Sequence, residues 1–136
     1  MHQIIVFSRG GNTRKIAEEM AKGLNVPAMD VTGAELESEG VIFLGSGCYG
    51  GKPSPKMMDF IAANTFQGRK CAIFGTSGGG EGIHLPSMES ALKENGASIV
   101  GSFDCKGKTF GLVNRGRPNA EDLENAKKFA FEIANY

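Results

Sequence analysis

The residues best suited to chemistry in this chain form a short polar loop close to its start. The loop reads Ser8-Arg9-Gly10-Gly11-Asn12-Thr13 and lies between an apolar run at residues 4–7 and a segment of helical periodicity. A buried strand that leads through a glycine-rich turn into a helix N-terminus directs unpaired backbone N–H groups and the positive end of the helix dipole at one point. The hydroxyl and amide side chains add donors, and the two glycines allow close approach. We therefore expect an anion site here.

Other interpretations of this loop have to be weighed. No Gly-Lys-Ser/Thr sequence follows it, so it is not a Walker A loop, and the Gly-x-Gly-x-x-Gly spacing of dinucleotide-binding folds is absent. Taken by itself, an ordinary tight turn with Asn12 or Thr13 as the helix cap explains the loop equally well. The rest of the chain shifts the balance toward a ligand site.

The loop opens an alternation of strand and helix patterns that runs through the chain. Continuous apolar runs predict buried strands, and amphipathic segments predict helices between them. The expected strands are residues 4–7, 26–31, 41–44, 70–74 and 98–103, and the expected helices are residues 13–24, 54–64, 86–95 and a last one capped by Asn119. Apolar strands separated by helices indicate a parallel sheet covered on both faces. The expected fold class is α/β, with a single doubly wound domain over residues 1–136.

Two further glycine-rich loops follow predicted strands, at residues 45–51 and 75–82. The carboxyl ends of parallel strands share one edge of the sheet, so all three loops should converge there. Turn chemistry explains a single such loop, whereas three together favour a flat ligand that the backbone approaches closely. The second loop offers the aromatic ring of Tyr49, and the third offers backbone N–H groups and Glu81. The first loop offers a phosphate site, the second an aromatic plane and the third a polar edge. Together these features fit a phosphorylated planar heterocycle such as FMN.

Composition excludes several other classes of function. The chain has 136 residues, and its 15 basic and 15 acidic residues cancel, so net charge gives no indication of a nucleic-acid or membrane partner. No apolar run approaches membrane-spanning length and no leader is recognisable, so a cytoplasmic location is expected. A basic stretch at residues 104–118 contains Lys106, Lys108, Arg115 and Arg117. A solvated loop is the favoured interpretation of that stretch, and a docking patch for an acidic partner stays open.

The cysteines, the second histidine and the methionines carry weaker signals of function than the three loops. Three cysteines without Cys-x-x-Cys spacing argue against disulfides and zinc, with Cys71 in the core and Cys48 and Cys105 in loops. A surface or helix-start position is favoured for His84 over a ligand contact. Met57, Met58 and Met88 lie on helical stripes and should be core residues.

The chain resembles a short-chain flavodoxin over nearly its whole length. In that family the first loop typically reads Ser-x-Thr-Gly-x-Thr, and Ser8, Gly11 and Thr13 match it here. The resemblance implies strand order 2-1-3-4-5 with FMN at the sheet edge, an arrangement for which flavodoxin is the standard example. The chain departs from the family pattern at Gly10, where a hydroxyl residue is usual. It also lacks an aromatic residue around residues 77–79 and the acidic surface common in the family.

The resemblance also implies roles for the three loops. The first would hold the FMN phosphate, the second would stack Tyr49 on the flavin, and the third would meet its pyrimidine edge. The Gly50–Gly51 peptide would turn to accept a hydrogen bond from N5 of the reduced flavin. The expected cofactor-binding residues, with no catalytic residue and no metal ligand among them, are Ser8, Arg9, Gly10, Gly11, Asn12, Thr13, Ser46, Gly47, Cys48, Tyr49, Gly50, Gly51, Thr76, Ser77, Gly78, Gly79, Gly80 and Glu81.

The resulting functional hypothesis is a low-potential electron carrier between redox enzymes. Its partners would be a reductase and an acceptor protein, and the chain would be a monomer or a weak homodimer. The alternative is an FMN-dependent NAD(P)H:acceptor reductase of the quinone type, because the bare outer face of the flavin leaves room for a nicotinamide to stack. A flavin-free module is disfavoured, because Phe7-Ser8-Arg9 supplies neither the carboxylate of a receiver domain nor the cysteine of a phosphatase.

Overall fold

The computed structural model describes residues 1–107 and 116–135, and its elements alternate between strand and helix. In chain order they are β1 (Gln3–Phe7), α1 (Asn12–Leu24), β2 (Ala28–Asp30), β3 (Ile42–Gly47), α2 (Pro55–Ala63), β4 (Lys70–Ser77), α3 (Leu85–Glu94), β5 (Ser98–Lys106) and α4 (Ala120–Ala134). The five strands form one sheet of order β2-β1-β3-β4-β5 in which every pairing is parallel. The predicted fold class and strand order are confirmed.

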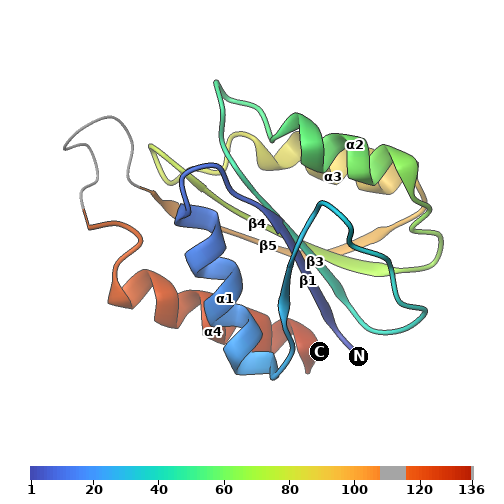
Figure 1. Cartoon of the computed structure of the whole chain (residues 1–136), viewed down its shortest axis with the longest axis horizontal. Coiled ribbons are helices and arrows are strands. Elements are labelled where there is room, and N and C mark those ends of the chain that lie inside the picture. Colours follow the sequence, from blue (N-terminus) through green and yellow to red (C-terminus); the bar gives the residue numbers. More distant parts are fainter. Residues whose placement is uncertain (108–115, 136) are drawn as a thin grey trace.

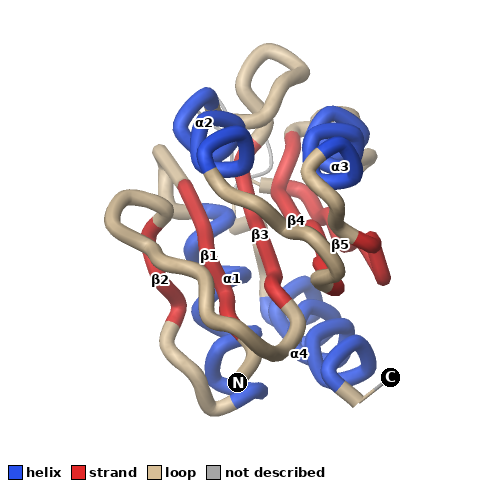
Figure 2. The backbone as a smooth tube through the Cα atoms, turned by 90° about the vertical axis from the view of Figure 1, so that its right-hand side faces the viewer, coloured by secondary structure: helices blue, strands red, loops and turns tan. Residues whose placement is uncertain are grey.

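Two helical layers cover the sheet. Helices α1 and α4 lie on one face, and α2 and α3 lie on the other (Figures 1 and 2). The side chains of each strand therefore divide between two cores. Ile4 and Val6 point into the core under α1 and α4, whereas Ile5 between them points into the core under α2 and α3. Because both faces are covered, the strands read as unbroken apolar runs in the sequence.

Three strands extend further than the sequence predicts. β3 continues to Gly47, β4 to Ser77 and β5 to Lys106. Gly45, Ser46 and Gly47 pair in register with Phe74, Gly75 and Thr76, so small and polar residues carry the ladder on toward the sheet edge. The second strand, in contrast, is shorter than predicted and covers Ala28–Asp30.

The longer β5 corrects the expectation for one cysteine. Cys105 lies within this strand and is buried, not in a loop. Burial, followed by the negative charges of Asp122 and Asp104, raises the pKa of the Cys105 thiol to about 12. Cys71 is buried in β4 as predicted, and burial raises the pKa of its thiol to about 12 as well. Both thiols are therefore unreactive core groups.

The methionine prediction is confirmed. Met57 and Met88 are fully buried, and the half-buried Met58 packs against the same core between the sheet and helices α2 and α3. In the part of the chain that the structure describes, no helix has the length and apolar character that crossing a membrane requires.

The last helix begins with a capping box. The Asn119 side chain accepts a hydrogen bond from the Asp122 backbone N–H, and the Asp122 carboxylate accepts one from the Asn119 backbone N–H. The Arg117 guanidinium also donates to both oxygens of Asp122, at 2.6 and 2.7 Å. Burial alone would raise the pKa of the Asp122 carboxyl, but these hydrogen bonds and the charge of Arg117 outweigh it and lower that pKa.

We predict that Asp122 stabilises the fold at neutral pH and that this stabilisation is lost in acid. A carboxyl whose folded-state pKa is lowered contributes fully above its unfolded pKa and loses the contribution as pH falls through the folded value. Asp122→Asn should therefore lower the free energy of unfolding at pH 7 by on the order of 1 kcal/mol. In urea unfolding the difference should shrink as pH falls below about 4. A difference that stays constant down to pH 2 would contradict this assignment, and Glu132→Gln is the control.

Candidate functional site

A cavity of about 690 Å³ opens at the sheet edge where β1, β3 and β4 end. Twelve of the eighteen predicted cofactor-binding residues line it, together with Gly107. The lining residues are Ser8, Arg9, Gly10, Asn12, Thr13, Gly47, Cys48, Tyr49, Gly50, Thr76, Ser77, Gly78 and Gly107. The structure thus brings the three glycine-rich loops together as the sequence predicts. Gly107 was missed, although its place directly after the fifth strand is at the same sheet edge.

The N-terminus of α1 carries unpaired donors at this cavity. Its N-cap is Gly11, with φ +90°, and no side chain caps it. The plain helix cap considered for Asn12 or Thr13 therefore does not form. The backbone N–H groups of Thr13 and Arg14 have no acceptor among the described residues, and the first turn has no acidic side chain. An anion satisfies such a helix end, and a phosphate group fits this donor set.

Helices α2 and α4 show that an uncapped end is not general in this chain. The Ser54 hydroxyl accepts a hydrogen bond from the Lys56 backbone N–H at the start of α2, and Asn119 caps α4. The Ser8 hydroxyl could serve α1, but it instead accepts the Gly11 N–H at 3.0 Å and so shapes the loop before the helix. Helix α3 also begins without a side-chain cap, at His84, so α1 is distinguished by the cavity at its uncapped end and not by the missing cap alone.

A buried hydroxyl pair joins the first loop to the third. The side-chain oxygens of Thr13 and Thr76 lie 2.8 Å apart, and both residues are almost fully buried. This hydrogen bond ties the first turn of α1 to the end of β4, across 63 positions of sequence. It fixes the distance between the uncapped helix end and the part of the cavity that Ser77 and Gly78 line.

Tyr49 lies against the first loop. Its hydroxyl accepts the Arg9 backbone N–H at 2.9 Å, and the Arg9 guanidinium carbon lies 4.5 Å from the centre of its ring. An antiparallel bridge between Tyr49 and Lys52 closes the turn around Gly50 and Gly51, whose φ values are +63° and +82°. Glycine adopts such positive φ angles without steric cost, so this turn favours glycine at both positions.

Ser46 anchors the second loop and does not line the cavity. It is fully buried, its hydroxyl donates to the Gly47 carbonyl at 2.8 Å, and it accepts the Ser54 backbone N–H at 2.9 Å. This side chain therefore clamps the two ends of the segment that carries Tyr49 and the glycine turn. Its role is to position the loop.

His84 is fully buried, which corrects the surface position considered from the sequence. It does lie at a helix start, directly before α3. Its Nε2 is 2.8 Å from the carbonyl oxygen of Ser46, beneath the cavity floor. A Cβ on Gly75 would lie 2.3 Å from that nitrogen, so the imidazole requires glycine there. The histidine is not among the residues that line the cavity.

The outer part of the third loop turns away from this cavity. Gly80 and Glu81 line a neighbouring hollow of about 340 Å³ together with Asp104. Burial raises the pKa of the Asp104 carboxyl, although the Ser77 hydroxyl donates to it at 2.7 Å. Gly11, Gly51 and Gly79 also do not line the main cavity. From the basic stretch, Lys108 and Arg115 lie outside the described residues.

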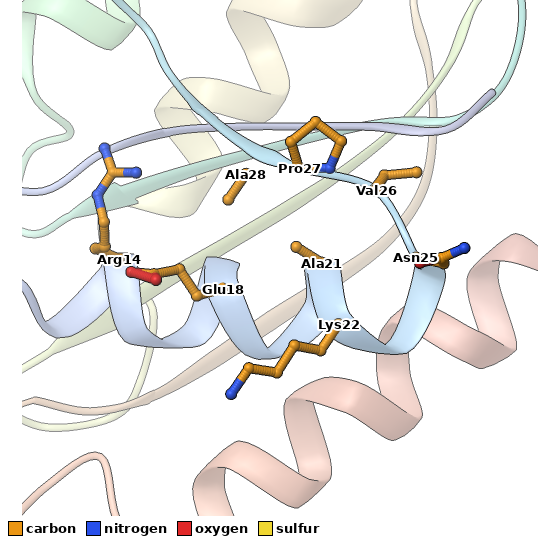
Figure 3. Close-up of a pocket in the computed structure, with 8 residues that line it drawn as sticks. All are labelled: Arg14, Glu18, Ala21, Lys22, Asn25, Val26, Pro27 and Ala28. Atoms are coloured by element: carbon orange, nitrogen blue, oxygen red, sulfur yellow. The ribbon is translucent and has the colours of Figure 1, made fainter.

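Another hollow, of about 560 Å³, lies between α1 and the segment that enters β2 (Figure 3). Arg14 and Glu18 on α1 lie across from Pro27 and Ala28. The Arg14 guanidinium pairs with Asp30 at 3.1 Å, and none of the described residues that line this hollow belongs to a glycine-rich loop. The sheet-edge cavity is therefore the better candidate for a ligand site.

Comparison with known proteins gives consistent results. A family model described as a flavodoxin domain matches residues 3–111. An uncharacterised protein from Methanocaldococcus jannaschii is 32% identical over 134 residues, which cover 90% of this chain and 89% of that protein. A flavodoxin from Clostridium beijerinckii is 29% identical over 110 residues, 72% of this chain and 80% of its own. The solved structure of a flavodoxin from the domain Archaea covers 99% of this chain and 97% of its own, with a TM-score of 0.79 and 23% identity.

The role given to Ser46 is testable. In Ser46→Ala the buried Ser54 N–H loses its acceptor, and an unpaired buried donor costs about 1–3 kcal/mol. We expect the free energy of unfolding in urea, measured without cofactor, to fall by that amount. Ser98→Ala, at the exposed start of β5, is the matched control and should be close to wild type. Equal stability of the two variants would show that the clamp contributes nothing.

Proposed function

This chain belongs to the flavodoxin family, and we propose that its sheet-edge cavity holds the FMN with which it transfers electrons. The family match and the curated flavodoxin relatives make it an FMN-binding electron-transfer protein. The observation that carries the assignment of the site is the uncapped end of α1, whose unpaired N–H groups meet the cavity between three glycine-rich loops. That donor set suits the phosphate of FMN, and the aromatic and glycine residues suit its flat ring.

The phosphate would lie against the first loop. The backbone N–H groups of Thr13 and Arg14 supply neutral donors there, and the helix dipole adds a favourable field. Arg9 is the one charged side chain among the described residues that line the cavity. We assign it the role of offsetting the phosphate charge, in a loop where Gly10 supplies no hydroxyl.

The ring would lie between the second and third loops. FMN, when bound, supplies the redox chemistry by taking up and releasing electrons. Tyr49 would cover one face of the ring, and the Gly50 carbonyl would accept a hydrogen bond from the reduced ring. Thr76, Ser77 and Gly78 would meet its polar edge. None of the described lining residues is a carboxylate or a histidine, so the cavity lacks the commonest side-chain acids and bases and suits electron transfer better than proton chemistry.

The reductase alternative is not favoured by the matched family and the flavodoxin relatives. A direct observation separates the two functions. NADH or NADPH alone should leave the absorbance of bound FMN unchanged over minutes under anaerobic conditions, whereas a reductase would bleach it. Flavodoxins pass electrons to redox partner proteins, and we propose that this one works in the cytoplasm as a monomer or weak homodimer. Its three free cysteines suit a reducing compartment.

The phosphate contact predicts that the site distinguishes FMN from riboflavin. In fluorescence titration, FMN should bind at least about 100-fold more tightly, because losing the charged contacts costs on the order of 3 kcal/mol. Equal affinities would show that the uncapped helix end does not hold the phosphate. Failure of FMN to bind at micromolar concentration would remove the assignment of this cavity altogether.

The role of Arg9 predicts a selective loss. Arg9→Gln should lower the affinity for FMN about tenfold, which corresponds to about 1.4 kcal/mol of binding free energy. It should leave the affinity for riboflavin nearly unchanged. Lys22→Gln is the control, because Lys22 lies in the last turn of α1, remote from the cavity. The proposed role is wrong if the Arg9 variant weakens both flavins equally, since that pattern would indicate a distorted loop.

A further inference from the structure

We infer that the mouth of the cavity is a docking surface for an electron-transfer protein whose own contact face is acidic around an apolar centre. The inference rests on FMN occupying the cavity, since only then does a partner at this mouth face the redox group. It is carried by a group of exposed cations, by an exposed isoleucine beside the glycine turn, and by the absence of ion pairs at those cations within the described residues.

The cations come from separate segments: Arg9 lines the cavity, and Lys52 and Lys56 lie next to residues at or beside its lining. Arg9 lies over the ring of Tyr49, at 4.5 Å from its centre. Lys52 is held beside the same tyrosine by two backbone hydrogen bonds, of 2.8 and 3.2 Å. The Lys56 ammonium lies 5.6 Å from the centre of the Phe7 ring, directly before the first loop. We call Arg9, Lys52 and Lys56 the cationic rim, and all three residues are exposed.

These cations differ from several others in the chain because no carboxylate of the described residues neutralises them. With FMN bound, Arg9 would face its phosphate, so Lys52 and Lys56 are the cations of the rim that stay free for a partner. Arg14, Lys93 and Lys127 each pair with a carboxylate, at 3.1, 2.8 and 3.4 Å. Among the described residues, no carboxylate lies within ion-pair distance of the cationic rim. The chain as a whole is neutral, with 15 basic and 15 acidic residues, so the positive charge at the mouth is a matter of placement.

The nearby carboxylates only partly offset this charge. Asp59 lies on α2, three positions after Lys56, and Glu81 folds back onto its own loop, with its carboxyl carbon 3.8 Å from the Cβ position of Gly79. Lys106 adds a further exposed cation, directly before Gly107 of the cavity lining. The charged groups near the opening are therefore mostly positive.

An apolar contact lies beside the rim. Ile83 is 61% exposed, and its Cδ1 lies 3.8 Å from the Cβ position of Gly51 in the glycine turn. The described part of the chain exposes two other large apolar side chains, Met1 and Phe131; none of the three lines the cavity, but Ile83 lies against the glycine turn that borders it. An apolar group next to unpaired cations fits a protein face of carboxylates around an apolar centre. A nucleic acid would gain little from the isoleucine.

The charge of the mouth can be measured with small oxidants of opposite charge. The FMN-loaded protein is reduced anaerobically, and its reoxidation by ferricyanide, a trianion, or by hexaammineruthenium(III), a trication, is followed by stopped flow. Each oxidant ion removes one electron from the flavin, so two ions reoxidise a fully reduced protein. Reoxidation by ferricyanide should become slower as the salt concentration rises, and reoxidation by hexaammineruthenium(III) should become faster. The opposite salt dependence would overturn the proposal.

A pair of matched variants locates the effect. The double variant Lys52→Glu and Lys56→Glu should lower the rate of reoxidation by ferricyanide about tenfold at low salt. It should also reverse the salt dependence of that rate. Lys70→Glu combined with Lys128→Glu makes the same change in net charge at exposed positions away from the cavity lining and should change the rate less than about threefold. Equal effects of the two pairs would overturn the proposal. FMN absorbance, measured for each variant, distinguishes a failed docking surface from a failed cofactor site.

The apolar part is tested with protein oxidants. An acidic c-type cytochrome should reoxidise the protein faster than a basic one at low salt. Ile83→Ser should lower the rate of reoxidation by the acidic cytochrome about threefold to tenfold. It should leave the rate with ferricyanide unchanged, because ferricyanide needs no apolar contact. Phe131→Ser, an equally exposed apolar residue on α4, is the control. Faster reaction with the basic cytochrome, or salt-dependent binding of duplex DNA with no effect of Ile83→Ser, would overturn the assignment of an acidic protein partner.

Discussion

Backbone N–H groups in the first turn of a helix need an acceptor, and in α1 the fold leaves them facing a cavity. The residue before the helix is a glycine in the left-handed region, and it has no side chain with which to cap. The parallel sheet brings the ends of β3 and β4 to the same edge, so a ligand that accepts from these N–H groups would be surrounded by the same loops. The uncapped helix end and the convergence of the loops therefore occur at the same place in the molecule.

The loops around that place are positioned by contacts outside the cavity lining as well as within it. The Ser46 hydroxyl clamps the second loop through the Gly47 carbonyl and the Ser54 N–H, and His84, directly before α3, supports the carbonyl group of Ser46 itself. Gly75 leaves the space that the imidazole needs. Residues that do not line the cavity thus determine the shape of its wall, which explains why polar groups are buried under an otherwise apolar sheet.

The fold and most of the site could be predicted from the sequence, and the remaining errors have physical causes. Unbroken apolar runs gave the parallel sheet, but the runs stop at glycine and serine while the strand pairing continues through Gly45 and Gly75. The depth of His84 depends on Gly75, a contact between segments that no local pattern shows. The outward course of Gly80 and Glu81 depends on the hollow around Asp104, which forms only when β5 is paired.

Three of the tethers that shape the cavity share a chemical property. Ser8 to Gly11, Thr13 to Thr76 and Ser46 to Ser54 are all hydrogen bonds made by hydroxyl groups. Aliphatic hydroxyls do not ionise in the range in which proteins are folded. These three tethers therefore keep their charge state when the surrounding proton concentration changes, and this part of the cavity wall holds its shape without any group gaining or losing a proton.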